Sequence, residues 1–395
     1  MEIRFPMWLR VVDRPGARVF ASLNAVEAMS RALIAGILPL EAERLLSDAQ
    51  RISMLYTVIG VVAFGSSFLV PLVMRKLRRK WIFSAGVGCM VLAPLLLAVA
   101  NAVSFSAALQ LRAFAVVAVN ISLNLYILDY IRRKDFLVAE PMRLAYLAAA
   151  WCVGPGLGIF IYKQLGLETV CVLSASCALL ALGYFWFLRL KEHPAVAPAV
   201  RRSPMPWHYL KRFVAQPRLR LAWIIPFGRS CFWTCFFVYP PLYIIRNGGG
   251  EMTVAVLLTA GQGLLFLSPL VGRLGARFGI RRMIVAAAVW CASMCMLAGL
   301  MAPGPGWCAL LFFLAALGAV VLDALGNIPF LRSVRSYERA EMTSVFRTYI
   351  EASQLVPSML FVPLLSVAPL HATFVLLGLI VLVSAWYARY LPRRL

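Results

Sequence analysis

Long apolar runs separated by short polar segments make up most of the chain. A helix needs about 20 mostly apolar residues to cross the hydrocarbon core of a bilayer. By this length the pattern predicts an all-α, polytopic membrane protein. Because no short cleavable hydrophobic segment precedes the first run, we expect that run to be retained as a membrane helix. Twelve transmembrane helices are expected, near residues 18–40, 52–74, 81–100, 104–130, 143–162, 168–188, 220–245, 252–273, 282–301, 307–331, 343–365 and 370–388.

The composition excludes a soluble fold. Apolar residues make up 62% of the chain, against roughly 45–50% in soluble domains, and charged residues only 14%. Such a chain cannot supply the polar surface that a soluble domain of this size needs. The nine cysteines all lie in apolar stretches without the spacing of a zinc site, so we expect packing thiols and neither metal nor cofactor. No nucleophile, histidine and acid combine into a catalytic set, so an enzyme is not expected.

Basic residues are distributed very unevenly along the predicted topology. The chain has 39 Lys and Arg against 16 Asp and Glu, and 32 of the basic residues fall in the termini and the even-numbered loops. Four fall on the opposite side. Because positively charged loops stay in the cytoplasm, both termini are predicted there. The excess charge therefore needs no nucleic-acid partner. External loops without glycosylation sites favour a bacterial inner membrane.

One long hydrophilic stretch, residues 189–219, divides the chain into two parts of six predicted helices, residues 1–188 and 220–395. Its prolines predict a semi-rigid linker, and residues 207–214 predict a short helix on the cytoplasmic surface. The two parts look like copies of one another, an arrangement that transporters use for alternating access. The pairs separated by 203 residues are Asn120 and Asp323, Asn124 and Asn327, Arg132 and Arg335, and Asp135 and Glu338.

A basic segment after the second predicted helix has a counterpart after the eighth. Residues 272–281 read Gly-Arg-Leu-Gly-Ala-Arg-Phe-Gly-Ile-Arg, and the more divergent copy covers residues 71–80. These segments resemble the G-x-L-A-D-R-x-G-R-K motif of the major facilitator superfamily, although both lack its acidic residue. The resemblance extends over nearly the whole chain and implies twelve helices in two pseudo-symmetric bundles of six. The matching residues of the clearer copy are Gly272, Arg277, Gly279 and Arg281.

The fifth predicted helix carries a second resemblance. Residues 150–159 read Ala-Trp-Cys-Val-Gly-Pro-Gly-Leu-Gly-Ile, and drug–proton antiporters of the same superfamily have G-x-x-x-G-P-x-x-G-G at this place. Gly154, Pro155 and Gly158 match that motif. The resemblance implies the antiporter type of this superfamily. General packing is the alternative, because small residues let helices approach closely and proline bends them.

Ionisable side chains inside predicted membrane helices are the best candidates for function. Each costs about 2.5–3.5 kcal/mol at the bilayer centre, so such groups face one another or water rather than lipid. In the resembled fold the first, fourth, seventh and tenth helices line a central cavity, which the eleventh flanks, and these are the helices that carry charges here. The six groups are Glu27, Arg31, Arg112, Arg229, Asp323 and Glu351.

The acidic members of this set are candidates for proton coupling. Glu27 and Arg31 are one helical turn apart and can form an ion pair. The helix of Asp323 offers Asn327 one turn away but no cation, which favours proton exchange near neutral pH. We therefore rank Asp323 first, Glu351 second and Glu27 third. An ion pair of Asp323 with an arginine across the cavity, either Arg112 or Arg229, is the open alternative.

Polar and basic residues on the same helices are candidates for substrate binding. Guanidinium groups suit carboxylate or phosphate, so the three arginines can bind an anionic group or, equally, balance the three acids. The aromatic residues Tyr126, Trp233, Phe236, Phe237 and Tyr349 can wall an amphipathic pocket. The substrate-binding candidates are Asn24, Arg31, Arg112, Asn120, Asn124, Arg229, Trp233, Gln262, Asn327 and Gln354.

These observations predict a secondary active transporter that exports a small amphipathic or anionic organic molecule in exchange for protons. Its expected partners are the small-molecule substrate, protons and the lipid bilayer, and a monomer is expected. One alternative is a proton symporter that imports an organic anion. Another is a lipid-handling or non-transporting protein on the same scaffold.

Overall fold

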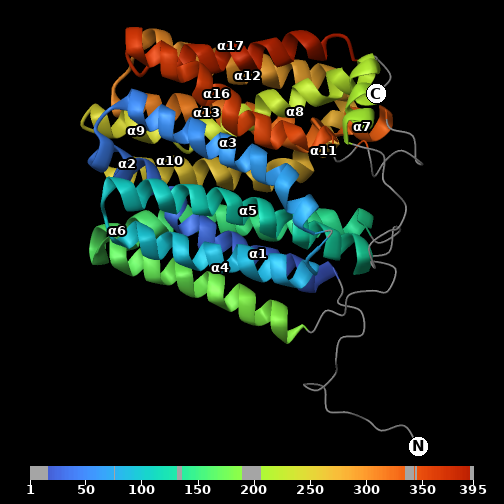
Figure 1. Ribbon diagram of the computed structural model, residues 1–395. Coiled ribbons are helices and arrows are strands. Elements are labelled where there is room, and N and C mark those ends of the chain that lie inside the picture. The colour runs from blue at the N-terminus through green and yellow to red at the C-terminus, as the bar shows by residue number, and fades with distance from the viewer. Residues whose placement is uncertain are drawn as a thin grey trace, which may run out of the picture.

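The computed structural model describes residues 17–74, 76–130, 136–188, 206–333, 342 and 345–391. Within these ranges the chain forms helices and short connections and no β-strand. The helices lie side by side along one common direction (Figure 1). α2 and α9 occupy one end of the bundle, and α7 and α11 the opposite end (Figure 1). The all-α architecture predicted from the sequence is confirmed.

The first part of the chain contains six assigned helices. They are α1 Ala17–Ala35, α2 Leu38–Leu46, α3 Ala49–Val73, α4 Arg79–Ala98, α5 Ala102–Tyr130 and α6 Phe136–Phe187. α6 is interrupted at Gly166, whose φ of 85° and ψ of 173° are not helical. Glycine adopts such a positive φ without the clash that a Cβ atom would cause. The break falls between the fifth and sixth predicted membrane helices.

The second part begins with a short helix and continues with apolar ones. They are α7 Pro206–Ala215, α8 Pro217–Phe236, α9 Tyr239–Arg246, α10 Glu251–Gly263, the 3₁₀ helix η4 Leu264–Leu267, α11 Ser268–Phe278, α12 Ile280–Met301, α13 Pro305–Leu325, α14 Ile328–Ser333, α16 Thr348–Val367 and α17 Ala372–Ala388. Several predicted membrane helices are therefore divided into two pieces. Prolines follow such breaks, at Pro39 in α2 and at Pro240 and Pro241 in α9. Proline is tolerated in the first turn of a helix, where its missing N–H has no partner to lose.

Nine segments of the described chain are long and apolar enough to cross a membrane. One of them, residues 145–187, contains the break at Gly166. Two shorter apolar helices cover Glu251–Leu267 and Ala372–Ala388. The protein is thus a multi-pass membrane protein, and the count of twelve crossings stays a prediction.

Close packing joins helices both within and between the two parts of the chain. α1 packs along α6, α4 along α5, and α12 along α13 and α17. Between the parts, α3 lies along α16, α10 along α6, and α2 along α9. α3 approaches α16 closely at Gly60, where a Cβ atom would lie 2.8 Å from the Cα of Leu355.

The short helix expected at residues 207–214 is present as α7. Phe213 points inward from it and is only 3% exposed. It packs in a hydrophobic cluster with Leu219, Phe330, Met342 and Phe346, so α7 is held against the end of the second helical part. The linker residues 189–205 and the repeated loop residues Arg132, Asp135, Arg335 and Glu338 lie outside the described residues.

Candidate functional site

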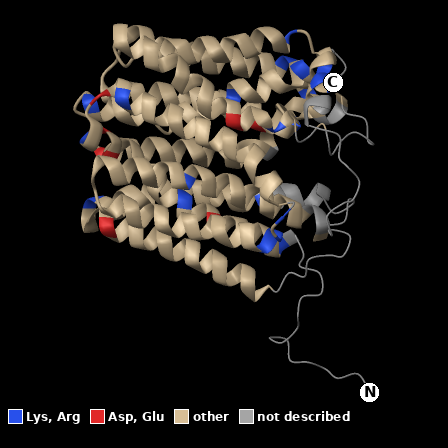
Figure 2. Cartoon of the chain, in the orientation of Figure 1, with Lys and Arg blue, Asp and Glu red and all other residues tan. Residues whose placement is uncertain are grey.

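The six ionisable groups predicted within the membrane all avoid an exposed position in the structure. Glu27 and Arg31 lie on α1, Arg112 on α5, Arg229 on α8, Asp323 on α13 and Glu351 on α16. Figure 2 shows that other described charged residues gather toward the ends of the bundle, with a small number midway along the helices. Contacts join five of these groups into a cluster in each part of the chain, and Glu351 is the sixth, on α16 of the second part.

In the first cluster, Glu27 and Arg31 form the expected ion pair along α1. Arg31 Nε lies 2.8 Å from Glu27 Oε1, and Arg31 Nη2 donates to Glu27 Oε2 at 2.9 Å. Glu27 is 1% exposed. The guanidinium of Arg31 also lies 5.9 Å from the ring centroid of Trp151 on α6. Both oxygens of Glu27 are therefore taken by the arginine of its own helix.

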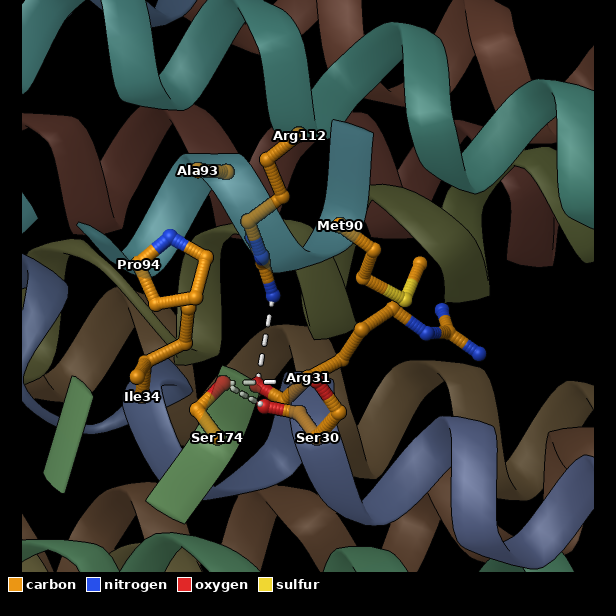
Figure 3. Close-up of a pocket in the computed structure, with 8 residues that line it drawn as sticks. All are labelled: Ser30, Arg31, Ile34, Met90, Ala93, Pro94, Arg112 and Ser174. Atoms are coloured by element: carbon orange, nitrogen blue, oxygen red, sulfur yellow. Dashed lines mark hydrogen bonds between the residues drawn. The ribbon is translucent and has the colours of Figure 1, made fainter. Parts of the chain in front are cut away.

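Arg112 belongs to the same region but has no such carboxylate. Its Nη2 donates to the backbone carbonyl of Arg31 at 3.4 Å, and its Nε has no hydrogen-bond partner among the described residues. The side chain reaches from α5 toward α1 and α6, as Figure 3 shows. It borders a narrow gap that has no room for a water molecule. The lining residues are Ser30, Arg31, Ile34, Met90, Ala93, Pro94, Arg112 and Ser174.

The second cluster joins three helices around Asp323. Arg229 Nη1 lies 3.1 Å from Asp323 Oδ1, and Trp233 Nε1 donates to Asp323 Oδ2 at 2.7 Å. Arg229 Nη2 donates to the Tyr349 hydroxyl on α16 at 3.0 Å. The expectation that Asp323 lacks a fixed cation is therefore wrong. The alternative pairing with Arg229 is the one observed, and it was not decidable from sequence because the partners lie on different helices.

Glu351 lies in the first turn of α16, four residues after Arg347 at the N-cap. It is partly buried, and its Oε2 has no hydrogen-bond partner among the described residues. Asp323 has a partner on each oxygen, whereas Glu351 has an open one. The two acids ranked first and second from the sequence therefore differ in how readily a proton can reach them without breaking a contact.

Most of the polar candidates fall on the same helices, while Gln262 lies on α10 and Asn327 in the turn between α13 and α14. Asn24 and Gln262 are nearly buried, at 2% and 5% exposure, and Asn24 Nδ2 has no partner within the described structure. Asn327 Oδ1 is likewise without a partner there. Asn120, Asn124 and Gln354 are partly buried on α5 and α16.

Of the aromatic candidates, Trp233 and Tyr349 contact the charged groups, as described above. Tyr126 and Phe236 are instead buried in hydrophobic clusters of the first and second parts. Phe237 packs against Trp151 across the two parts, with ring centroids 5.2 Å apart. The expectation that all five line one pocket is wrong for Tyr126 and Phe236, because their rings pack into these clusters.

The glycines of the antiporter-like motif hold α6 against α1. A Cβ atom at Gly154 would overlap Ala32, and one at Gly158 would overlap the backbone carbonyl of Leu33. Pro155 between them is buried. These contacts give the motif a packing role, the alternative that the sequence left open.

The loop motif covers the second half of α11, Gly279 and the first residues of α12. Gly279 connects the two helices with a φ of 89°, which favours glycine. Arg277 is exposed and its guanidinium lies 5.5 Å from the ring centroid of Phe278. Gly272 is exposed as well, and Arg281 is partly buried. No described ion pair involves the arginines of this motif.

Sequence reasoning missed a set of polar contacts that join the two parts at the end where α2 and α9 lie. Arg246 Nε lies 2.8 Å from Glu43 Oε1, and Arg246 Nη2 donates to the Ser47 carbonyl at 3.0 Å. The hydroxyls of Ser53 and Tyr239 are 2.9 Å apart. In the sequence, Arg246 is only one of the four basic residues on the side opposite the termini. Its partner Glu43 is 203 positions away on another helix, so the spacing of the two residues in the sequence could not predict this ion pair.

Comparison with known proteins assigns this arrangement to a class. The family model described as Major Facilitator Superfamily matches residues 20–266. The match covers more than half of the chain, so the protein belongs to the major facilitator superfamily. It is accordingly a membrane transporter rather than an enzyme. No curated protein matches the chain.

Solved transporter structures share the fold over nearly its full length. A POT family transporter in complex with 5-aminolevulinic acid aligns with a TM-score of 0.76 at 11% identity, covering 94% of this chain and 95% of that one. A POT family transporter in complex with a thioalcohol-conjugated peptide gives 0.75 at 12% identity and 94% of both chains. The nucleoside transporter NupG gives 0.68 at 13% identity, covering 95% and 98%. At these identities the likeness concerns the fold alone.

Proposed function

We propose that this transporter exports a small amphipathic or anionic organic molecule in exchange for protons. The observation that carries the proposal is the partly buried carboxyl of Glu351, which has an oxygen without a hydrogen-bond partner among the described residues, whereas Asp323 is ion-paired. A carboxyl in this setting can take up a proton without losing a contact. A proton arriving at Asp323 would instead compete with Arg229 and Trp233. We therefore place proton uptake at Glu351 and assign the Asp323 and Arg229 pair to the conformational switch.

Alternating access supplies the transport cycle. The two helical parts rock about a site near the middle of the membrane, so that it opens to one side at a time. The contacts of Arg246 with Glu43 and Ser47, and of Ser53 with Tyr239, favour a state closed at the end of α2 and α9. Proton binding shifts the balance of states only because the two states bind the proton unequally.

The topology and substrate belong to the same proposal. Both termini lie in the cytoplasm of a bacterial cell, and a monomer crosses the inner membrane twelve times in two six-helix bundles, residues 1–188 and 220–395. Three arginines at membrane depth favour an anionic group on the substrate. The structural neighbours support a small polar molecule, since they include POT family transporters in complex with 5-aminolevulinic acid and a peptide conjugate, and a nucleoside transporter. Import by proton symport is the second candidate, because the same groups serve either direction.

Everted membrane vesicles test the proposal. A dye that reports internal pH is monitored while a panel of organic acids and amphipathic compounds is added to energised vesicles. An exported substrate collapses the pH gradient in vesicles that hold the wild-type protein and accumulates inside them. A symporter would instead accumulate the substrate in right-side-out vesicles, which would contradict the export direction.

The role of Glu351 is tested by separating exchange from coupling. Glu351→Gln should retain substrate exchange at equal concentrations on both sides, since exchange needs no net proton movement. It should lose accumulation driven by a pH gradient. The exposed Glu168, at the break of α6, supplies the matched control Glu168→Gln, which should keep both activities. Gradient-driven accumulation by Glu351→Gln at the wild-type rate would remove Glu351 from the coupling mechanism.

A further inference from the structure

Lys80, in the first turn of α4, lies over two tryptophan rings that belong to different helices. Its Nζ atom is 5.8 Å from the ring centroid of Trp81 on α4 and 5.9 Å from that of Trp186 near the end of α6. The two rings meet edge to face, with centroids 5.7 Å apart. Because an ammonium group is attracted to the negative face of an aromatic ring, the two rings fix where this charge is presented.

Further contacts hold the ring of Trp186 in this position. Its Nε1 donates to the Ser84 hydroxyl at 3.1 Å, and that hydroxyl donates to the Lys80 carbonyl at 2.8 Å. Phe185, which is 3% exposed, packs against the ring with centroids 6.4 Å apart. Trp186 therefore cannot turn away without losing these contacts. We refer to Lys80, Trp81 and Trp186 together as the Lys80 cluster.

The positive charge of the Lys80 cluster has no acidic partner. Within the described residues the Lys80 ammonium forms neither an ion pair nor a hydrogen bond. The sequence contains no Asp or Glu from residue 49 to residue 128. The loop before α4 adds four more basic residues, Arg75, Lys76, Arg78 and Arg79. A surface with one sign of charge concentrates ions of the opposite sign, so this end of α4 attracts anions.

The length of α4 places the Lys80 cluster at the edge of the bilayer. α4 has 20 residues, and a helix of about this length just crosses the hydrocarbon core. Its first turn therefore lies at the level of the lipid headgroups, where tryptophan is enriched in membrane proteins. Trp81 and Trp186 are 55% and 43% exposed. α4 and α6 lie side by side at the lower edge of the bundle in Figure 1, so the cluster faces lipid.

We propose that the Lys80 cluster binds the phosphate of an anionic phospholipid. A phosphate oxygen accepts charge-assisted hydrogen bonds from an ammonium group. The quaternary ammonium of a choline headgroup would instead be repelled, because Lys80 already lies over the ring faces that such a cation prefers. The acyl chains follow the outward side of α4, where Leu92 and Leu95 are exposed below Trp81. This site depends on neither the substrate nor the direction of transport.

Native mass spectrometry of the purified full-length protein tests the site with named probes. Dioleoylphosphatidylglycerol, which is anionic, and dioleoylphosphatidylcholine, which is zwitterionic and has the same acyl chains, are titrated separately in detergent. We expect phosphatidylglycerol to bind several-fold more tightly, with a preference that falls as the salt concentration rises. Equal affinities of the two lipids would overturn the proposal. A dimer of the chain that forms without bound lipid would overturn it as well, since a second copy would then cover this face.

Variants connect the lipid preference to the Lys80 cluster. Lys80→Gln should weaken phosphatidylglycerol binding about fivefold, the effect of roughly 1 kcal/mol for one basic residue at an anionic membrane surface. Trp186→Leu should have a similar effect, because it removes one ring and the hydrogen bond to Ser84. Lys80→Arg should retain the preference, since a guanidinium also stacks on aromatic rings and binds phosphate. Phosphatidylcholine binding should stay the same in all three variants.

The matched control is Lys76→Gln, which removes an exposed lysine of the same loop that lies over no described aromatic ring. It should bind phosphatidylglycerol nearly as the wild type does. An equal loss in Lys76→Gln and Lys80→Gln would show that the loop attracts lipid by its net charge alone, which would refute the site. If Trp186→Leu does not fold, the two Lys80 variants carry the test. Lipid binding is measured without substrate or gradient, so a failure of proton-coupled export would leave this result intact, and the reverse also holds.

Discussion

The two charged clusters are built in different ways. In the first part of the chain, Glu27 and Arg31 pair within one helix, one turn apart. Arg112 on α5 donates to the backbone carbonyl of Arg31. In the second part, Arg229 and Asp323 pair between α8 and α13, and Tyr349 and Trp233 hold the pair from α16 and α8. The first pair stays intact if its neighbours move. The second depends on how three helices are placed.

This difference assigns distinct roles to the clusters. An ion pair within one helix stays formed when neighbouring helices move, so it does not favour one arrangement of the helices over another. An ion pair between helices stabilises one arrangement more than others, which is what a switch between two states requires. The Arg229 and Asp323 pair is also neutral, whereas Arg112 of the first cluster has no carboxylate within ion-pair distance among the described residues. We therefore expect the first cluster to bind and the second to switch.

The largest expected effect comes from breaking the pair between helices. Asp323→Asn leaves the charge of Arg229 buried without its partner, which should lower the free energy of unfolding by about 3–5 kcal/mol. Arg229→Gln together with Asp323→Asn should recover part of that loss, since neither charge then remains. Thermal unfolding and a double-mutant cycle measure both quantities.

Hydrogen exchange compares the two clusters directly. The exchange rates of α13 should rise in Asp323→Asn, because α13 loses its ion pair with α8. In Glu27→Gln, the exchange rates of α4 and α5 should stay near those of the wild type, since both partners of that pair lie on α1. Equal loosening of neighbouring helices by both variants would show that the two clusters do not differ in this way.

A smaller effect is expected where α6 supports the first cluster. Gly158→Ala places a methyl group against the Leu33 carbonyl of α1, and overpacking of this kind costs about 1–3 kcal/mol. Gly183→Ala on the same helix is the matched control, because a Cβ there meets nothing within 4 Å. The control should be neutral or slightly stabilising, given the higher helix propensity of alanine.

Thermal unfolding distinguishes these outcomes. The Arg229 and Asp323 pair should be unaffected. A variant Gly158→Ala as stable as Gly183→Ala would show that α1 and α6 can separate without cost and that the motif is not a packing device.

Sequence reasoning recovered what depends on local pattern. Apolar runs of membrane length, the break at Gly166, the short helix that became α7 and the Glu27 and Arg31 pair all follow from residues close together in the chain. The pairing of Asp323 with Arg229 and of Arg246 with Glu43 does not, because each joins residues at least 90 positions apart. Several arrangements of three arginines and three acids satisfy the same charge count, and helix placement alone selects among them.

The smallest effect concerns the contacts that close the end of α2 and α9. The Glu43 and Arg246 side chains are partly exposed, at 20% and 26%, and such pairs contribute about 0.2–1 kcal/mol. Glu43→Gln should therefore barely change the melting temperature. It should raise hydrogen exchange in Leu38–Leu46 and Tyr239–Arg246 by about two- to fivefold, since local opening depends on the same free energy. The charge-reversed double variant Glu43→Arg with Arg246→Glu should restore slow exchange, while either reversal alone should not. Unchanged exchange in Glu43→Gln and in both single reversals would mean that Ser53 and Tyr239, with the packing of α3 on α16, close this end without the ion pair.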